Sequence, residues 1–148
     1  MQNKHWILIQ STLLLLILFW PFKIELNLPA IVKNTGIFFL VGGFILAEIA
    51  VKALKDNLRP SPKPKVGGKL ITTGLYSIVR HPAYGAILIS ALGLGLWMND
   101  GVRLMLLVCL LIFFDAKSRI EEKWLEKRYS EYTDYKKHVT KKFIPGVF

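Results

Sequence analysis

The sequence predicts an all-α, integral membrane helical bundle with about four transmembrane helices and a C-terminal cytoplasmic amphipathic helix. Two observations predict this class: long apolar runs, and basic residues gathered at the ends of those runs. Hydrophobic residues make up 53% of the 148 residues, the mean hydropathy is +0.40 and the formal net charge is +10. Apolar runs with a basic excess at their ends indicate a membrane protein that faces an anionic leaflet. The length is that of one domain.

Apolar runs of nearly bilayer-spanning length are expected to form the membrane helices, since about 20 apolar residues cross a bilayer. The first run ends at Pro21 with no small-residue cleavage site after it, so we interpret it as a retained helix and not as a signal peptide. The triplet Asn99-Asp100-Gly101 favours a tight turn, which predicts a helical hairpin from the last two runs. The expected membrane helices are 6–22, 35–54, 82–98 and 102–116.

The second run carries an acidic residue, Glu48, with Lys52 one helical turn later. An acidic residue in a membrane helix is a functional candidate. Because Glu48 lies near the end of its run, we favour an ion pair with Lys52 instead.

Two polar segments complete the single domain over 1–148: a cytoplasmic loop over 55–81 and a cytoplasmic helix and tail over 117–148. Alternating prolines between Asp56 and Lys65 predict an extended segment, because proline fixes φ and lacks a backbone donor. In the C-terminal segment, three- and four-residue spacing predicts one apolar, aromatic stripe on a single helix. The stripe consists of Leu125, Tyr129, Tyr132, Tyr135 and Val139.

The charge distribution predicts the orientation. The loop and the C-terminal segment are rich in lysine and arginine, whereas the link after the first run and the turn near residue 100 carry few. The positive-inside rule therefore places both termini and the loop in the cytoplasm. The lipid bilayer is the expected partner, and the expected location is a prokaryotic cytoplasmic membrane.

Two other kinds of partner are not expected. The basic residues flank apolar runs and match no nucleic-acid motif, so nucleic acid is not predicted as a partner. A single cysteine, Cys109, excludes an intramolecular disulfide and a cysteine-based zinc site, and no metal is predicted.

Polar residues from the loop and from the C-terminal segment are expected to meet on the cytoplasmic side. The first group is Tyr76, Arg80, His81 and Tyr84, and the second is Lys117, Arg119, Glu121 and Glu122. Carboxylates suit an ammonium or ribose hydroxyls, aromatic rings suit a sulfonium or an adenine face, and arginine suits a carboxylate or phosphate. Pro82 is suited to open a helix, whose unpaired first-turn donors can bind an anionic group.

Two stretches of the sequence resemble the signature of the isoprenylcysteine carboxyl methyltransferase and phospholipid methyltransferase superfamily. The first stretch runs from Leu70 to Tyr76 and from Val79 to Gly85, and includes Arg-His-Pro. The second comprises Glu121-Glu122, Leu125, Tyr129, Tyr132, Tyr135 and Ile144-Pro145. The resemblance covers roughly residues 55–148, and a helical hairpin separates its two halves.

The resemblance implies a small integral-membrane enzyme that transfers a methyl group from S-adenosyl-L-methionine. It implies cofactor contacts at Leu70, Ile71, Tyr76, His81, Pro82, Ala83, Tyr84, Glu121 and Glu122. Lys117 or Arg119 falls where carboxyl methyltransferases place a substrate-contacting arginine. Arg80 and His81 are the catalytic candidates: a carboxylate acceptor would need no general base, whereas an amine or thiol could lose its proton to His81 or a glutamate.

The sequence leaves the methyl acceptor open among a prenylated cysteine carboxylate, a phospholipid amine, and a small apolar thiol or amine. Two other functions are considered. A non-catalytic membrane scaffold or assembly protein would keep the fold without binding the cofactor. A transporter would need paired intramembrane polar sites or internal repeats, and Glu48 alone offers anything of that kind.

Overall fold

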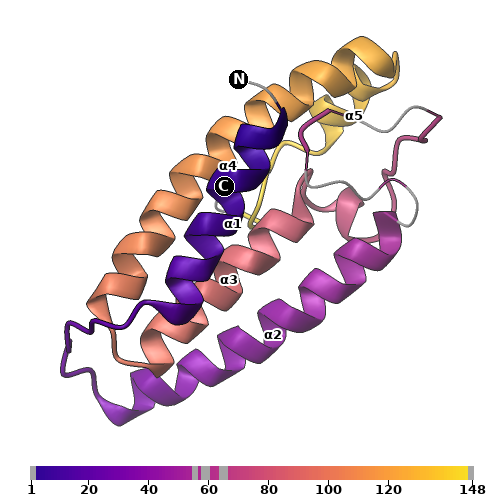
Figure 1. Ribbon diagram of the computed structural model, residues 1–148. Coiled ribbons are helices and arrows are strands. Elements are labelled where there is room, and N and C mark those ends of the chain that lie inside the picture. Colours follow the sequence, from indigo (N-terminus) through magenta and orange to yellow (C-terminus); the bar gives the residue numbers. More distant parts are fainter. Residues whose placement is uncertain (1–2, 55–56, 58–60, 64–66, 147–148) are drawn as a thin grey trace.

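The computed structural model describes residues 3–54, 57, 61–63 and 67–146, and the fold over these residues is all-α, as predicted (Figure 1). Four long helices run side by side along one axis, and a short fifth helix lies near one end. The elements are α1 (Asn3–Phe19), α2 (Ala30–Leu54), the 3₁₀ helix η2 (Gly74–Ser77), α3 (Pro82–Trp97), α4 (Gly101–Arg128) and α5 (Tyr132–His138). Most of the predicted extended proline segment lies outside the described residues.

Helix α2 is the described helix that is both long and apolar enough to cross a membrane. It has 25 residues, and its most apolar window has a mean hydropathy of 2.2. Apolar helices also cover Lys4–Phe19 and Pro82–Trp97, but both are shorter. Helix α2 begins five residues before the predicted run, directly after Pro29, whose carbonyl accepts from Val32 N and Lys33 N. The helix therefore begins before Lys33 and Asn34, and these polar residues form part of its first turns.

Helices α2 and α3 pack closely because glycines line the contact. A Cβ atom at Gly36 would lie 2.6 Å from Trp97 N, and one at Gly43 would lie 2.7 Å from Ser90 N. A Cβ atom at Gly93 would lie 2.6 Å from Gly36 O. Small residues of this kind allow two helix backbones to approach each other. We call this contact the glycine seam.

Helices α1, α3 and α4 share the apolar core, and polar contacts fasten the end of the molecule away from α5. In that end, Arg103 Nε donates to Ile17 O at the end of α1 (3.0 Å), and its guanidinium also pairs with Asp100. Asp100 is the N-cap of α4 and accepts from Val102 N. The predicted turn between α3 and α4 is confirmed, with Asn99 at φ 55°. The core residues are Trp6, Ile17, Leu88, Ala91, Leu110, Phe113, Phe114 and Phe143.

The charged C-terminal segment does not begin a new helix. Helix α4 continues through the predicted boundary at 116 and ends at Arg128, because a change from apolar to charged side chains does not interrupt backbone hydrogen bonding. The prediction that the aromatic stripe lies on one helix is wrong. The chain is extended at Tyr129 (φ −121°, ψ 112°) and becomes helical again at Tyr132, so the stripe is divided between α4 and α5.

Candidate functional site

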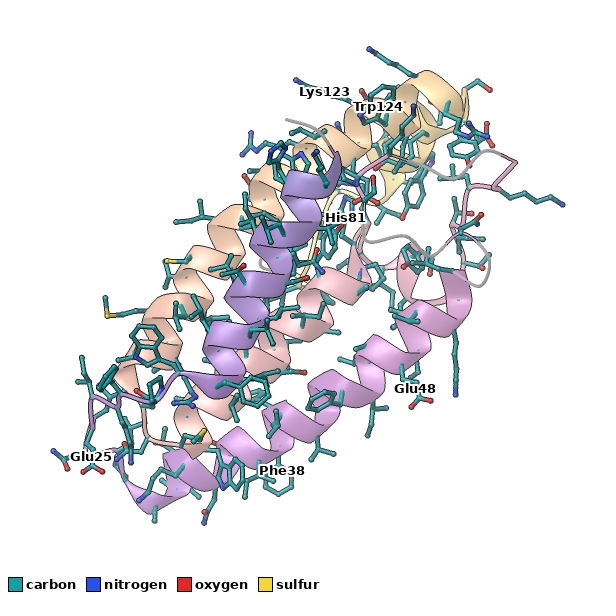
Figure 2. All side chains as sticks on the ribbon, viewed as in Figure 1. Glu25, Phe38, Glu48, His81, Lys123 and Trp124 are labelled. Atoms are coloured by element: carbon teal, nitrogen blue, oxygen red, sulfur yellow. The ribbon has the colours of Figure 1, made fainter. Side chains whose placement is uncertain are left out.

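The Arg-His-Pro segment forms the entry to α3. Pro82 occupies the first turn of the helix and His81 is the N-cap residue, in agreement with the predicted start. Just before it, η2 turns the chain after Gly74 (φ 63°) and directs Tyr76 inward, where its ring is buried. Figure 2 shows His81 inside the bundle, near the end that carries α5.

Residues 139–143, which we call the C-terminal strap, cross the entry to α3. Arg80 N donates to Lys141 O (3.0 Å) and His81 N donates to Lys142 O (2.8 Å). Arg80 Nη1 donates to two further strap carbonyls, Val139 O (2.7 Å) and Thr140 O (2.6 Å). The strap therefore fixes both the backbone and the guanidinium of the Arg-His-Pro segment.

Glu122 on α4 is the buried acceptor for this segment. Its Oε1 accepts from Arg80 Nε (2.8 Å) and lies 3.2 Å from His81 Nε2, while Oε2 lies 3.2 Å from Lys136 Nζ on α5. Burial alone would raise the pKa of Glu122, but hydrogen bonds from His81 and Arg80 outweigh burial and hold the pKa well below its ordinary 4.5. Glu122 therefore joins α3, α4 and α5 as an ionised carboxylate.

A column of stacked rings leads from His81 into the core. The His81 and Tyr84 rings are stacked at 5.4 Å, and the Tyr84 and Phe114 rings at 4.5 Å. Phe143 of the strap meets His81 and Tyr84 edge-on, each at 6.2 Å. Tyr84 Oη donates to Glu121 Oε2 (2.8 Å), which sets the neighbouring carboxylate of α4 beside the column.

A pocket opens where these elements meet. Its cavity volume is about 140 Å³, well above the roughly 15 Å³ that one water molecule needs, so a ligand can enter. Eight of the residues proposed from sequence line it: Leu70, Ile71, Tyr76, Arg80, His81, Ala83, Tyr84 and Glu121. Four members of the predicted stripe also line it: Leu125, Tyr129, Tyr132 and Tyr135. The remaining lining residues, absent from the sequence prediction of the site, are Leu54, Asn57, Ser61, Lys63 and Lys69.

The other proposed residues lie outside the lining. Pro82 is buried in the first turn of α3, and Glu122 lies behind Arg80 and His81. Lys117 is buried toward α1, where its Nζ donates to Gln10 Oε1 and lies 5.1 Å from the centre of the Tyr84 ring. Arg119 is exposed and pairs with Asp115 (2.7 Å).

Tyrosine and asparagine side chains fasten the walls of the pocket. Tyr129 Oη donates to Gly68 O (2.8 Å), Tyr135 Oη donates to Tyr76 O (2.6 Å), and Asn57 Nδ2 donates to Lys69 O (2.8 Å). The two tyrosine bonds join the segment before α3 to the C-terminal end of α4 and to α5, and the Asn57 bond joins two parts of the loop between α2 and α3. The loop residues carry no periodic signal, so their place at the pocket follows from the fold and not from spacing. Tyr129 and Tyr135, in contrast, belong to the aromatic stripe that the sequence predicts.

Among the described lining residues, the pocket offers one carboxylate, several aromatic faces and lysines. Glu121 can accept hydrogen bonds, ring faces attract a cation, and Lys63 and Lys69 suit an anionic group. Within the described residues, no group of three or more histidine, cysteine or acidic side chains is placed to hold a metal ion.

A family model described as phospholipid methyltransferase matches residues 32–132. The chain belongs to this family. The match runs from the first turn of α2 to the first residue of α5. It therefore includes the first stretch of the signature and the part of the second stretch from Glu121 to Tyr132, and it ends before Tyr135 and Ile144-Pro145. The resemblance drawn from the Arg-His-Pro and Glu-Glu motifs is thereby confirmed.

Curated relatives of this phospholipid methyltransferase family member have different names. The chain is 30% identical over 135 residues to the Delta(14)-sterol reductase of Arabidopsis thaliana, covering 85% of the chain and 36% of the relative. It is 38% identical over 72 residues to the protein-S-isoprenylcysteine O-methyltransferase of Saccharomyces cerevisiae, covering 47% and 30%. It is 32% identical over 77 residues to the cobalt-zinc-cadmium resistance protein CzcN of Cupriavidus metallidurans, covering 51% and 35%. The chain thus spans about a third of the length of each.

Proposed function

We propose that the protein transfers a methyl group from S-adenosyl-L-methionine to an apolar or membrane-associated acceptor at the cytoplasmic face of a membrane. The observation that carries this proposal is the pocket itself. Residues from both halves of the methyltransferase signature, including His81, Tyr84 and Glu121, line one cavity although the hairpin of α3 and α4 separates them in sequence. Membership of the phospholipid methyltransferase family supports the same activity.

The pocket residues fit the proposed cofactor. The Glu121 carboxylate suits ribose hydroxyls or the ammonium group, and the tyrosine rings suit a sulfonium. When bound, the cofactor would supply an activated methyl group with a good leaving group. The protein then needs chiefly to align the acceptor and exclude water.

Arg80 and His81 have separate parts in this proposal. Arg80 donates to Glu122 and to two strap carbonyls, so it acts as a positioning residue and not as an acid or base. His81 lines the pocket, and Glu122 orients its ring through Nε2. An amine or thiol acceptor could therefore pass a proton to His81, whereas a carboxylate acceptor would need no base.

We further propose that α1, α2, α3 and residues 102–116 of α4 are embedded in the bilayer as one domain. The pocket, the remainder of α4 and both termini then lie on the cytoplasmic side. The outer face of α2 supports this, because large apolar side chains are exposed along it; Figure 2 labels Phe38 on this face. The exposed members on α2 are Ile31, Ile37, Phe38, Phe39, Val41, Phe44, Ile45, Ile49 and Val51. Lysines and arginines gather at the pocket end, as the positive-inside rule requires.

Cysteine labelling tests the orientation. In a Cys109→Ser background, a single cysteine at Lys137 should react with a membrane-impermeant maleimide in inside-out vesicles and stay protected in intact cells. A single cysteine at Glu25, in the link at the other end, should react in the opposite pattern. The reverse result for the two sites would overturn the proposed orientation.

The activity is tested with labelled cofactor. Purified protein in detergent is supplied with S-adenosyl-L-methionine carrying a labelled methyl group and with fractionated membrane lipids. Label in an extractable apolar product is the expected result, and the chemistry of that product identifies the acceptor. Binding without transfer to any fraction would contradict the proposed acceptor class, and absence of both binding and transfer would favour a scaffold.

A reductase is the second candidate, because the match to the Arabidopsis Delta(14)-sterol reductase covers 85% of the chain. The same experiment separates the two activities. A reductase would leave the lipid fractions unlabelled and would not bind S-adenosylhomocysteine, whereas a methyltransferase should bind this product.

A further inference from the structure

The Tyr132 hydroxyl is buried without a hydrogen-bond partner. The side chain is 1% exposed, and within the described part of the chain this hydroxyl is the buried side-chain polar atom that lacks a partner. Tyr132 also belongs to the lining of the pocket. A buried hydroxyl without a partner costs free energy. Because Tyr132 also lines a cavity, the unused donor calls for an explanation.

The other tyrosines show how unusual this hydroxyl is. The chain has 5 tyrosines, and all of them line the pocket. Tyr84 donates to Glu121, Tyr129 to Gly68 O, Tyr135 to Tyr76 O and Tyr76 to Ala50 O. Four tyrosines therefore build the walls with their hydroxyls, and the fifth keeps its donor unused.

We propose that Tyr132 is a ligand-binding residue whose hydroxyl donates a hydrogen bond to the S-adenosyl ligand in the pocket. This assignment rests on the proposed function for the identity of the ligand. The acceptor is an oxygen or ring nitrogen of that ligand, since a phenol that keeps its proton is a donor.

The surroundings of Tyr132 keep it in the donor form. Burial and the nearby Glu122 charge raise the pKa of its hydroxyl well above the ordinary value of 10.0. The ring lies 5.6 Å from the Tyr135 ring. A neutral donor can bond an acceptor without adding a charge to the site.

Two tyrosine-to-phenylalanine variants test the assignment. Tyr132→Phe removes an unpaired hydroxyl, so the unliganded protein should melt at the same temperature as wild type or higher. Its affinity for S-adenosylhomocysteine, measured by calorimetry in detergent, should fall about tenfold through loss of one hydrogen bond. Tyr135→Phe is the matched control: it removes a hydroxyl that donates to Tyr76 O, so it should lower the melting temperature of the unliganded protein.

The outcomes separate this assignment from the proposed function. Wild type that is folded but does not bind S-adenosylhomocysteine overturns the proposed function and, with it, the ligand of Tyr132. Wild type that binds while Tyr132→Phe binds equally well overturns the Tyr132 assignment alone. Reduced affinity without a lowered melting temperature supports it, because a purely structural role would move stability and not binding.

Discussion

Helix α3 is held at its N-terminus by buried charges and along its side by glycines. At the N-terminus, Arg80 and His81 contact Glu122 and the C-terminal strap; we call these residues together the polar junction. Along the glycine seam, Gly43 and Gly93 bring the backbones of α2 and α3 together with no charged group involved. The two regions stabilise the same helix through different physics.

The polar junction and the glycine seam respond to different changes. The glycine seam depends on shape, so any added atom disturbs it and a change of pH does not. The polar junction depends on ionisation and on hydrogen bonds between segments far apart in sequence. The pocket lies at the polar junction, where charged and polar side chains can bind a charged or polar ligand. The glycine seam packs α2 against α3, and none of its glycines is among the described residues that line the pocket.

Removal of the Glu122 charge should have the largest effect. Glu122→Gln leaves the Arg80 guanidinium buried beside a neutral amide, and loss of one partner from a buried ion pair costs about 3 kcal/mol in the free energy of unfolding. Denaturant unfolding in detergent measures this change. Glu126→Gln is the matched control on the same helix, since its pair with Lys136 is partly exposed and should contribute little. Equal effects of the two variants would contradict the account of the polar junction.

Acid should weaken the polar junction by protonating Glu122, which removes the same charge. Because the pKa of Glu122 is lower in the folded protein than in the unfolded chain, its contribution is complete above the unfolded pKa and is lost as pH falls through the folded one. The free energy of unfolding of wild type should therefore begin to drop below about pH 5 and continue to drop as the pH is lowered further, and that of Glu122→Gln should drop less. Parallel curves for the two proteins would show that another group causes the loss.

The glycine seam should respond to a single methyl group. Gly43→Ala would place its Cβ 2.7 Å from Ser90 N and 2.8 Å from Ala86 O, both backbone atoms that cannot move aside, so about 2 kcal/mol of stability should be lost. Gly42→Ala is the control, because nothing lies within 4 Å of its Cβ and alanine favours a helix. Thermal unfolding should show a lower melting temperature for Gly43→Ala alone. Similar melting temperatures would mean that the two helices are not in close contact.

The smallest effect is expected at Glu48. It pairs with Lys52 at 2.7 Å, with both side chains largely exposed, as Figure 2 shows for Glu48 on the outer side of α2. The preferred interpretation of Glu48 as an i,i+4 pair thus agrees with the structure. Glu48→Gln should leave the melting temperature and the methyl transfer rate unchanged. Loss of transfer in a stable Glu48→Gln protein would restore Glu48 as a functional residue.

Local signals in the sequence predicted the parts of the fold that local chemistry decides. Pro82 begins α3 because its fixed φ and missing donor suit a first helical turn, and Asn99 and Asp100 make the turn that precedes α4. The sequence pattern does not predict the end of α4, because the charged stretch from 117 indicates a separate element. Hydropathy changes at 117, but the backbone has no reason to stop there and continues to Arg128.

The site was predictable only where motif residues face the pocket. Glu121 and Glu122 are adjacent in sequence, and the structure separates them: Glu121 lines the pocket, whereas Glu122 lies behind Arg80 and His81. The two side chains point in different directions from α4. Which of them faces the pocket can be decided only when the face of α4 that packs against α3 is known. Asn57 and Lys63 reach the pocket from a loop without regular spacing, so only the tertiary structure reveals them.

Cofactor binding by Glu121→Gln tests the central claim most directly. The amide keeps an oxygen to accept from Tyr84, so the fold should persist, but the charge offered to the ligand is removed. Calorimetry with S-adenosylhomocysteine should show saturable binding to wild type, unchanged binding to the exposed control Glu131→Gln, and at least about tenfold weaker binding to Glu121→Gln. No binding to folded wild type, or equal binding to wild type and Glu121→Gln, would contradict the claim that this pocket holds the methyl donor.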